Sequence, residues 1–309
     1  MKKIFISLIL FSCIQANAFE FINKLSKESS KAENVSSLIW YGDYNEMAQL
    51  SGFPGKNDSM HLAGPNVINI DRDFSIGSFV VNAKVVAENR KLNVKGIYIH
   101  LAPGEGGLNS LTLKNSTLKA TQHYSPAVIG GLEERYVSRA LLKLINSTAK
   151  FGGLYSMTVS NTNLKPSTPI GGSMISLEGK SQLEFGGILM DSFIKSNPEL
   201  ITSDLEFIER DGNIPQLIFN SDSNDIARTN IKLLITQTAK KGKYTIIEFT
   251  GKSSYEGVFD TIIINGKKIA FDEFRQVGSL KAKLTKAPST TGKDKSTAND
   301  IVLVIEDSK

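Results

Sequence analysis

The residues best suited to chemistry in this sequence are two aspartates, Asp71 and Asp73, in the segment IDRDF. Side chains two apart on an extended strand point to the same side, so the spacing predicts two carboxylates on one face with Arg72 opposite. Paired carboxylates serve glycoside hydrolysis, and they also bind calcium. Aspartates gather equally at polar turns that precede strands, and the sequence favours that structural role.

A second acidic group, Asp222 and Asp225 in the segment SDSND, offers oxygen ligands of the kind calcium binds. The segment lacks the spaced acids and the glycine of a known calcium loop, which favours an ordinary loop. No cofactor is expected, and calcium is the one metal considered. The three histidines are not spaced as metal ligands and have no evident nucleophile beside them; they are His61, His100 and His123.

The elements that would position these residues repeat along the chain. Leu111–Ala120 (LTLKNSTLKA), Leu142–Phe151 (LKLINSTAKF) and Ile175–Phe185 (ISLEGKSQLEF) each contain an alternating run, a small polar corner and a second short run. The copies begin at nearly equal intervals. A strand–corner–strand unit that recurs in this way indicates a solenoid, because one unit alone cannot bury its apolar face.

The corners specify the type of solenoid. Asn115, Asn146 and Gly179 are residues that tolerate left-handed backbone conformations, which a helix would not require at this spacing. The sequence therefore predicts an all-β chain, a right-handed single-stranded parallel β-helix with a C-terminal antiparallel hairpin cap. Coils of about 20–25 residues would give about ten coils.

Residues 1–18 have the pattern of a secretory signal peptide: a basic start at Lys2 and Lys3, an apolar core, and a small-x-small site ending at Ala18. Cys13 lies in a segment that loosely matches a lipoprotein signal, but Phe11 is bulky where that signal needs a small residue. Cleavage would leave residues 19–309, which contain no cysteine, and the loss of the two lysines would lower the formal charge from +5 to +3. The chain is therefore expected to be exported and weakly basic, which argues against nucleic-acid binding.

Composition divides the remaining chain. Residues 19–39 are expected to form an N-terminal arm or a short capping helix, residues 40–241 the parallel β-helix, and residues 242–309 a β-rich closing module. The Asn265-Gly266 pair predicts a tight hairpin in that module. Residues 281–298 are expected to be a polar loop.

Two further segments leave helix and strand open. Leu132–Leu144 has apolar residues at every fourth position, which suits a short helix, although its end also suits a strand. Glu199–Glu209 suits either a helical turn or a strand.

Both ends of the exported region resemble bacterial autotransporter passenger domains. The first stretch has Trp40, the turn Phe53–Asp58 and the strands within Val67–Val81; the last has Gly242–Ile247 and Asn299–Val304. The resemblance implies a parallel β-helix over most of the chain. Passenger domains continue into a translocator β-barrel, and no barrel-like strands follow here, so self-translocation is not expected.

The resemblance implies a binding or structural role, adhesin-like, in the periplasm or outside the cell, with an unknown protein or glycan as partner. No membrane span is expected after residue 18, because no later stretch is long and apolar enough. The alternative is a carbohydrate-active enzyme of the lyase or hydrolase type, for which Asp71 and Asp73 are the candidates. An enzyme needs acids from adjacent coils to converge in a groove with a basic partner.

Overall fold

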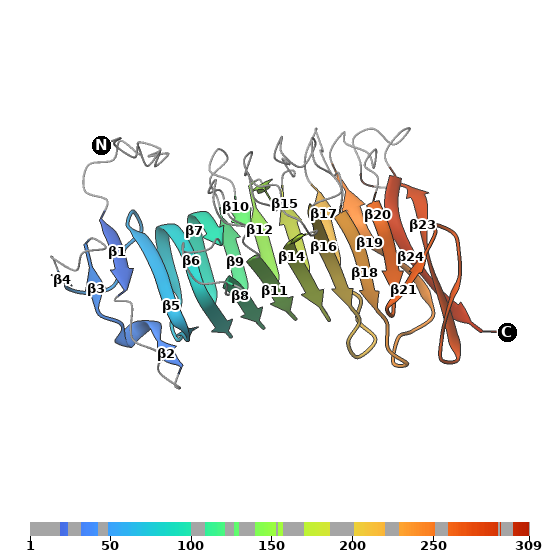
Figure 1. The fold of residues 1–309 in the computed structure, drawn as a ribbon, viewed down its shortest axis with the longest axis horizontal. Helices are drawn as coiled ribbons and strands as arrows, with labels where there is room; N and C mark the ends of the chain where they lie inside the picture. The colour runs from blue at the N-terminus through green and yellow to red at the C-terminus, as the bar shows by residue number, and fades with distance from the viewer. Residues whose placement is uncertain are drawn as a thin grey trace.

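The chain is built from β-strands, as a computed structural model shows (Figure 1). The structure describes residues 19–23, 32–42, 49–99, 109–120, 127–129, 140–152, 154–156, 170–185, 201–219, 229–250, 259–289, 291 and 299–308. These residues contain no α-helix, and their one helical element is a 3-10 turn, η1 (Val35–Ser37). The all-β prediction is confirmed.

The strands fall into three groups along the chain. The N-terminal strands are β1 (Glu20–Asn23), β2 (Glu33–Asn34), β3 (Trp40–Tyr41) and β4 (Gln49–Leu50). The central strands are β5 (Ser59–Ile70), β6 (Phe74–Glu88), β7 (Lys91–Ile99), β8 (Asn109–Lys114), β9 (Thr117–Ala120), β10 (Ala127–Ile129), β11 (Ala140–Ile145), β12 (Thr148–Phe151), β13 (Leu154–Ser156), β14 (Ile170–Glu178), β15 (Gln182–Phe185), β16 (Ile201–Ile208), β17 (Gln216–Phe219), β18 (Thr229–Leu234), β19 (Gly242–Phe249) and β20 (Phe259–Ile264). The closing strands are β21 (Lys267–Ile269), β22 (Arg275–Val277), β23 (Leu280–Pro288) and β24 (Asn299–Asp307).

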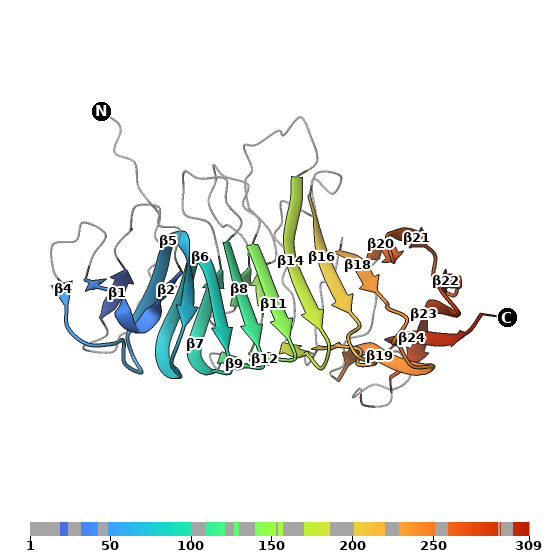
Figure 2. The same cartoon turned by 90° about the horizontal axis from the view of Figure 1, so that it is seen from below.

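The central strands stack in parallel along one axis and form a nearly closed, solenoid-like sheet (Figures 1 and 2). Their pairings define three faces. Face A contains β8, β11, β14, β16, β18 and β20 with the ends of β5 and β6. Face B contains β9, β12, β15, β17 and β19 with the starts of β6 and β7. Face C contains β10 and β13 with the remaining parts of β5, β6 and β7.

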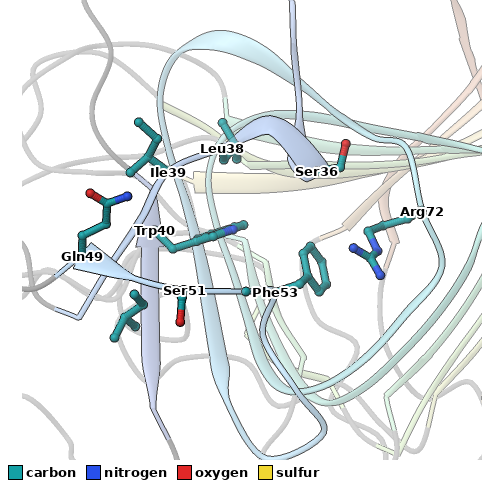
Figure 3. A pocket seen from close by; sticks show the side chains of 10 residues that line it. Ser36, Leu38, Ile39, Trp40, Gln49, Ser51, Phe53 and Arg72 are labelled. Carbon is teal, nitrogen blue, oxygen red and sulfur yellow. The ribbon is translucent and has the colours of Figure 1, made fainter.

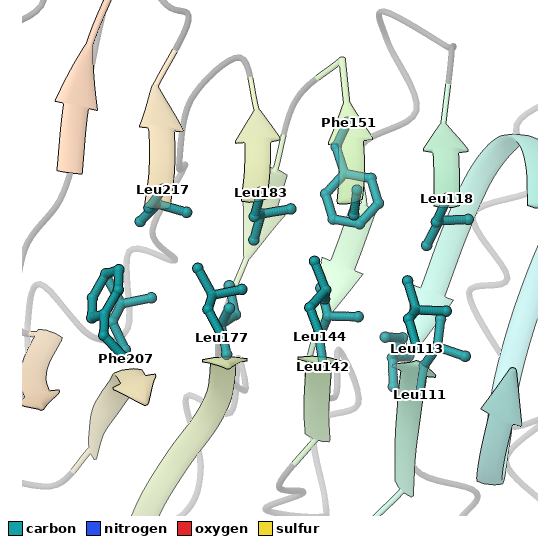
Figure 4. Packing of buried hydrophobic residues seen from close by; sticks show 14 of the residues in the cluster. Leu111, Leu113, Leu118, Leu142, Leu144, Phe151, Leu177, Leu183, Phe207 and Leu217 are labelled. Carbon is teal, nitrogen blue, oxygen red and sulfur yellow. The ribbon is translucent and has the colours of Figure 1, made fainter. Parts of the chain in front are cut away.

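The predicted repeats lie in register above one another. Leu111, Leu142 and Ile175 are direct partners on adjacent strands of face A. Each is fully buried, and the whole row is at most 4 % exposed; its rungs are Ile68, Val85, Leu111, Leu142, Ile175, Leu205, Ile231 and Ile262. Opposite it, face B contributes a row of smaller and aliphatic residues that includes Leu118, Ala149 and Leu183, and the two rows meet in the core (Figure 4).

The coil length predicted from sequence was wrong. Ile68 and Val85 are the two rungs of the face A row that lie closest in the chain, and after Val85 every interval between rungs is longer than the predicted coil. The described residues therefore give fewer rungs than the number of coils predicted.

The corner between face A and face B is built from stacked left-handed residues. Asn115 and Asn146 have φ of +47° and +48°, and Gly179 has +65°, which confirms the conformation predicted for these positions. The serines that follow, Ser116 and Ser147, are buried, and the Ser116 backbone N–H donates to the Ser147 Oγ at 3.0 Å. Each corner thereby satisfies backbone groups of its neighbour.

The C-terminal strands reverse the pairing. The first half of β19 pairs antiparallel with β24, which pairs antiparallel with β23 and so closes the end of the solenoid. Asn265 and Gly266, with φ of +48° and +74°, form the predicted hairpin between β20 and β21. The polar loop expected over 281–298 was wrong for its first part, because β23 buries Leu280, Ala282 and Leu284 between half-buried lysines.

The two segments left open between helix and strand form strands where the structure describes them, and the 19–39 segment combines short strands with the 3-10 turn η1. β1 is extended over part of 19–39, where a short helix was one expectation, and it pairs in parallel with β5. Residues 140–145 and 201–208 form β11 and β16. Residues 132–139 and the expected signal peptide at 1–18 lie outside the described residues.

Candidate functional site

The two aspartates predicted as a pair support different neighbours. Both lie in the short corner between β5 and β6, outside any strand. Asp71 accepts hydrogen bonds from the backbone N–H of Ser36, at 3.1 Å, and from its hydroxyl. Desolvation opposes the ionisation of Asp71, but the Ser36 donors and the charge of Arg90 outweigh it and lower its pKa. Asp73 accepts instead from the backbone N–H of Lys91 at 2.9 Å, so one carboxylate holds η1 and the other holds β7.

The remaining predicted candidates give no metal centre in the part of the chain that the structure describes. Four of them lie outside that part: Asp222, Asp225, His100 and His123. His61 places its Nε2 2.8 Å from Glu20 Oε1, and this hydrogen bond lowers the pKa of Glu20. Among the described residues, no three His, Cys, Asp or Glu side chains gather closely enough to hold a metal ion.

Face A carries acids from adjacent coils, each held by partners on neighbouring strands. Glu178 on β14 is only 5 % exposed and lies between two cations. Its carboxylate oxygens are 3.3 Å from Lys143 Nζ on β11 and 2.7 Å from Arg210 Nη2 after β16. A charge this buried needs such pairing, so the group joins three successive coils.

Two further acids on β16 follow the same rule. Asp204 accepts hydrogen bonds from Lys232 Nζ at 2.7 Å and Asn230 Nδ2 at 3.0 Å, both on β18. Glu206 accepts from the Ser176 hydroxyl at 2.7 Å on β14. These carboxylates connect coils, and the arrangement accounts for them structurally.

Two buried carboxylates lie where the solenoid turns or closes. Glu209 accepts from the Thr236 backbone N–H at 3.0 Å and the Thr238 hydroxyl at 3.0 Å. Burial disfavours its charge, but these donors prevail and lower the pKa of Glu209. Asp300 accepts from the Phe249 backbone N–H at 3.0 Å, and burial prevails there, raising its pKa. Both carboxylates fix backbone N–H groups of neighbouring segments.

Face B presents a regular polar surface to solvent. Its strands alternate exposed and buried residues, which directs Thr117 and Lys119 outward from β9 and Thr148 and Lys150 outward from β12. Thr117 pairs with Thr148 and Lys119 with Lys150 across the coils. Neighbouring strands lie about 4.8 Å apart, so like side chains repeat at that spacing. Lys150 also pairs with Glu184 on the next coil at 2.6 Å.

An amide relay continues this surface toward the C-terminal end. Gln182 Nε2 donates to Gln216 Oε1 at 3.0 Å, and Gln216 Nε2 donates to Glu248 Oε2 at 2.7 Å. Thr291 donates to the other oxygen of Glu248. These hydrogen bonds restrict the side chains along the row to one arrangement.

Face B was not predicted from the sequence, although the sequence contains a signal for it. Thr117-Leu118-Lys119 and Thr148-Ala149-Lys150 repeat the same outward pair within the recognised repeats. No sequence pattern indicated the partners of Glu178, because Arg210 lies at the end of another coil and is distant from Glu178 in the sequence.

Comparison with known proteins adds no family assignment. No family model, no curated protein and no solved structure matches the chain. Within the described residues there is no helix with the length and apolar character needed to cross a membrane.

Proposed function

We propose that this chain is an exported, right-handed parallel β-helix of the autotransporter passenger type that acts as a binding protein. Three features support the proposal: the in-register rows, the left-handed corner residues, and the antiparallel closure by β24. The signal-like start, residues 1–18, supports export to the periplasm or beyond. The role is adhesin-like, with a protein or glycan as ligand.

The observation that carries the binding role is the repetition of face B. Exposed threonines and lysines recur in register on β9 and β12, and the Gln182–Gln216–Glu248 relay extends them. A polymer with a regular repeat can contact such a surface at several coils at once, and weak contacts then add up. Solenoids use extended surfaces of this kind for binding.

The enzyme alternative has less support. Asp71 and Asp73 hold different backbone segments, and the face A acids Glu178, Asp204 and Glu206 are each bonded to a cation, an amide or a hydroxyl on a neighbouring coil. Turnover of acidic polysaccharides, measured with and without a calcium chelator, tests this alternative directly, and turnover would replace the binding proposal.

The proposal is tested by fractionation followed by binding. A cell fraction outside the cytoplasm should contain a protein that begins at Phe19, as mass spectrometry of its N-terminus would establish. The purified protein comprising residues 19–309 should bind to at least one of four coated surfaces, which carry polygalacturonate, dextran, collagen or fibronectin. Retention of the protein in the cytoplasm with residues 1–18 uncleaved, or binding to none of the four coated surfaces, would contradict the proposal.

A charge-reversal pair locates the binding surface. Lys119→Glu on face B should weaken binding at least tenfold and leave the circular dichroism spectrum unchanged, because the new carboxylate faces Lys150. Lys84→Glu, an exposed lysine on face A, is the matched control and should bind normally. Equal binding by the two variants would refute the placement on face B.

A further inference from the structure

A hollow of about 420 Å³ opens at the N-terminal end of the solenoid (Figure 3). Its volume lies within the range of small-molecule sites. Apolar and neutral polar groups line it together with one cation; the residues used below are Ser36, Ile39, Trp40, Gln49, Phe53 and Arg72. Face B lies along the side of the solenoid, so the hollow is a separate surface.

A chain of aromatic rings fixes the floor of the hollow. Trp40 contacts Phe21 and Phe53 edge to face, with ring centroids 6.2 and 6.1 Å apart. Phe53 in turn contacts Phe74, which packs on Phe79 in the core. Trp40 is 4 % exposed and its strand, β3, pairs with β1 and β4. These contacts and pairings anchor the floor to the first coils.

The cation at the rim has no carboxylate partner among the described residues. Arg72 is exposed, and its guanidinium stacks on the Phe53 ring at 4.4 Å. The two adjacent acids are engaged elsewhere, Asp71 with Ser36 and Asp73 with the Lys91 backbone. Stacking holds the guanidinium plane while leaving its N–H groups at the edge able to donate. An arginine oriented in this way is suited to a carboxylate, which it binds with two parallel hydrogen bonds.

We propose that this hollow binds a carboxylate-bearing sugar unit of the uronic acid type. The carboxylate pairs with Arg72, the ring packs beside Ile39 and the edge of Trp40, and the hydroxyls meet Ser36 and Gln49. Neutral polar groups around a single cation match a ligand that has many hydroxyls and one charge. The inference rests on the proposed binding role and assigns it a ligand class at a second site.

Trp40 makes the proposal testable, because it is the only tryptophan in the chain. Galacturonate should change the fluorescence of residues 19–309 in a saturable way, whereas its methyl ester and galactose should bind at least tenfold more weakly. Galactose 6-sulfate carries a negative charge but no carboxylate, so it tests whether charge alone is sufficient. It should also bind more weakly than galacturonate. Equal responses to galacturonate and its methyl ester, or no response to either at millimolar concentration, would overturn the proposal.

Two variants and a control complete the test. Arg72→Gln should weaken galacturonate binding at least tenfold, and Arg72→Lys should restore only part of it, since an ammonium cannot make the paired hydrogen bonds. Lys84→Gln should bind as the parent does. Unaltered urea midpoints would show that the fold persists, and unaltered galacturonate binding by Arg72→Gln would refute the site.

The result separates this site from the face B proposal. Loss of galacturonate binding in Arg72→Gln, with polymer binding still sensitive to Lys119→Glu, would support two sites. Polymer binding that depends on Lys119 without any galacturonate response would refute the hollow alone and leave the proposed function standing.

Discussion

Replacing Gly179 by alanine tests how the solenoid turns at its corner. Gly179 has φ of +65°, a conformation that costs an L-residue about 1–2 kcal/mol. A Cβ at this position would also overlap Oδ1 of Asn146 on the neighbouring coil. That oxygen accepts a hydrogen bond from the Lys180 backbone N–H at 3.0 Å, and displacing it costs roughly a further 0.5–1.5 kcal/mol. We therefore expect Gly179→Ala to lower the free energy of unfolding by about 2–3 kcal/mol.

Urea denaturation followed by circular dichroism measures this effect, and a matched glycine isolates its two parts. Gly266 has φ of +74°, but a Cβ there would meet nothing within 4 Å, so Gly266→Ala should cost the backbone part alone. In an Asn146→Gly background the overlap is gone, and Gly179→Ala should then cost about as much as Gly266→Ala. If Gly179→Ala costs no more than Gly266→Ala in the parent chain, the account of interlocking corners is wrong.

Three further predictions concern buried polar groups. Ser147→Ala leaves the Ser116 backbone N–H without its acceptor and should cost about 1–3 kcal/mol in urea denaturation, whereas the exposed control Ser75→Ala should be neutral. Because the pKa of Glu209 is lowered, its ionised carboxylate contributes to the free energy of unfolding above pH 4.5, and this contribution is lost as the pH falls through the pKa of the folded state. In the Glu209→Gln variant the free energy of unfolding should therefore decrease less as the pH is lowered. The same decrease as in the parent protein would contradict this. The pKa of Asp300 is raised above 3.8, so its contribution to the free energy of unfolding is present below pH 3.8 and is lost as the pH rises. Asp300→Asn should therefore be more stable than the parent protein between acidic and neutral pH.

The sequence predicted those features of the fold that depend on local residue types. Left-handed corners require Asn or Gly, so the positions of Asn115, Asn146 and Gly179 identified the turns and, with them, the register of the strands. The Asn265-Gly266 hairpin followed from the same requirement. Alternation of apolar and polar residues then determined which side chains face the core.

Features that join segments distant in the chain could not be predicted from local residue types. The coil length is a different case: a typical value was used, although the repeats that begin at Leu111, Leu142 and Ile175 already lie further apart than that value. Lysines between Leu280, Ala282 and Leu284 made β23 resemble a polar loop, because its buried face is narrow. The partners of Asp71 and Asp73 come from the η1 turn and from the next coil, and nothing in the sequence indicates that these segments lie beside the two acids.

Disulfide formation measures the stacking of coils most directly. Residues 19–309 contain no cysteine, so pairs can be introduced without background. Thr117 and Thr148 are direct partners on β9 and β12, and strands about 4.8 Å apart place their Cα atoms within the range that a disulfide spans. We predict that Thr117→Cys with Thr148→Cys oxidises readily, while Thr117→Cys with Lys150→Cys, which shares the outward side but is out of register, remains reduced. Equal oxidation of both pairs, or preference for the second, would contradict the in-register solenoid.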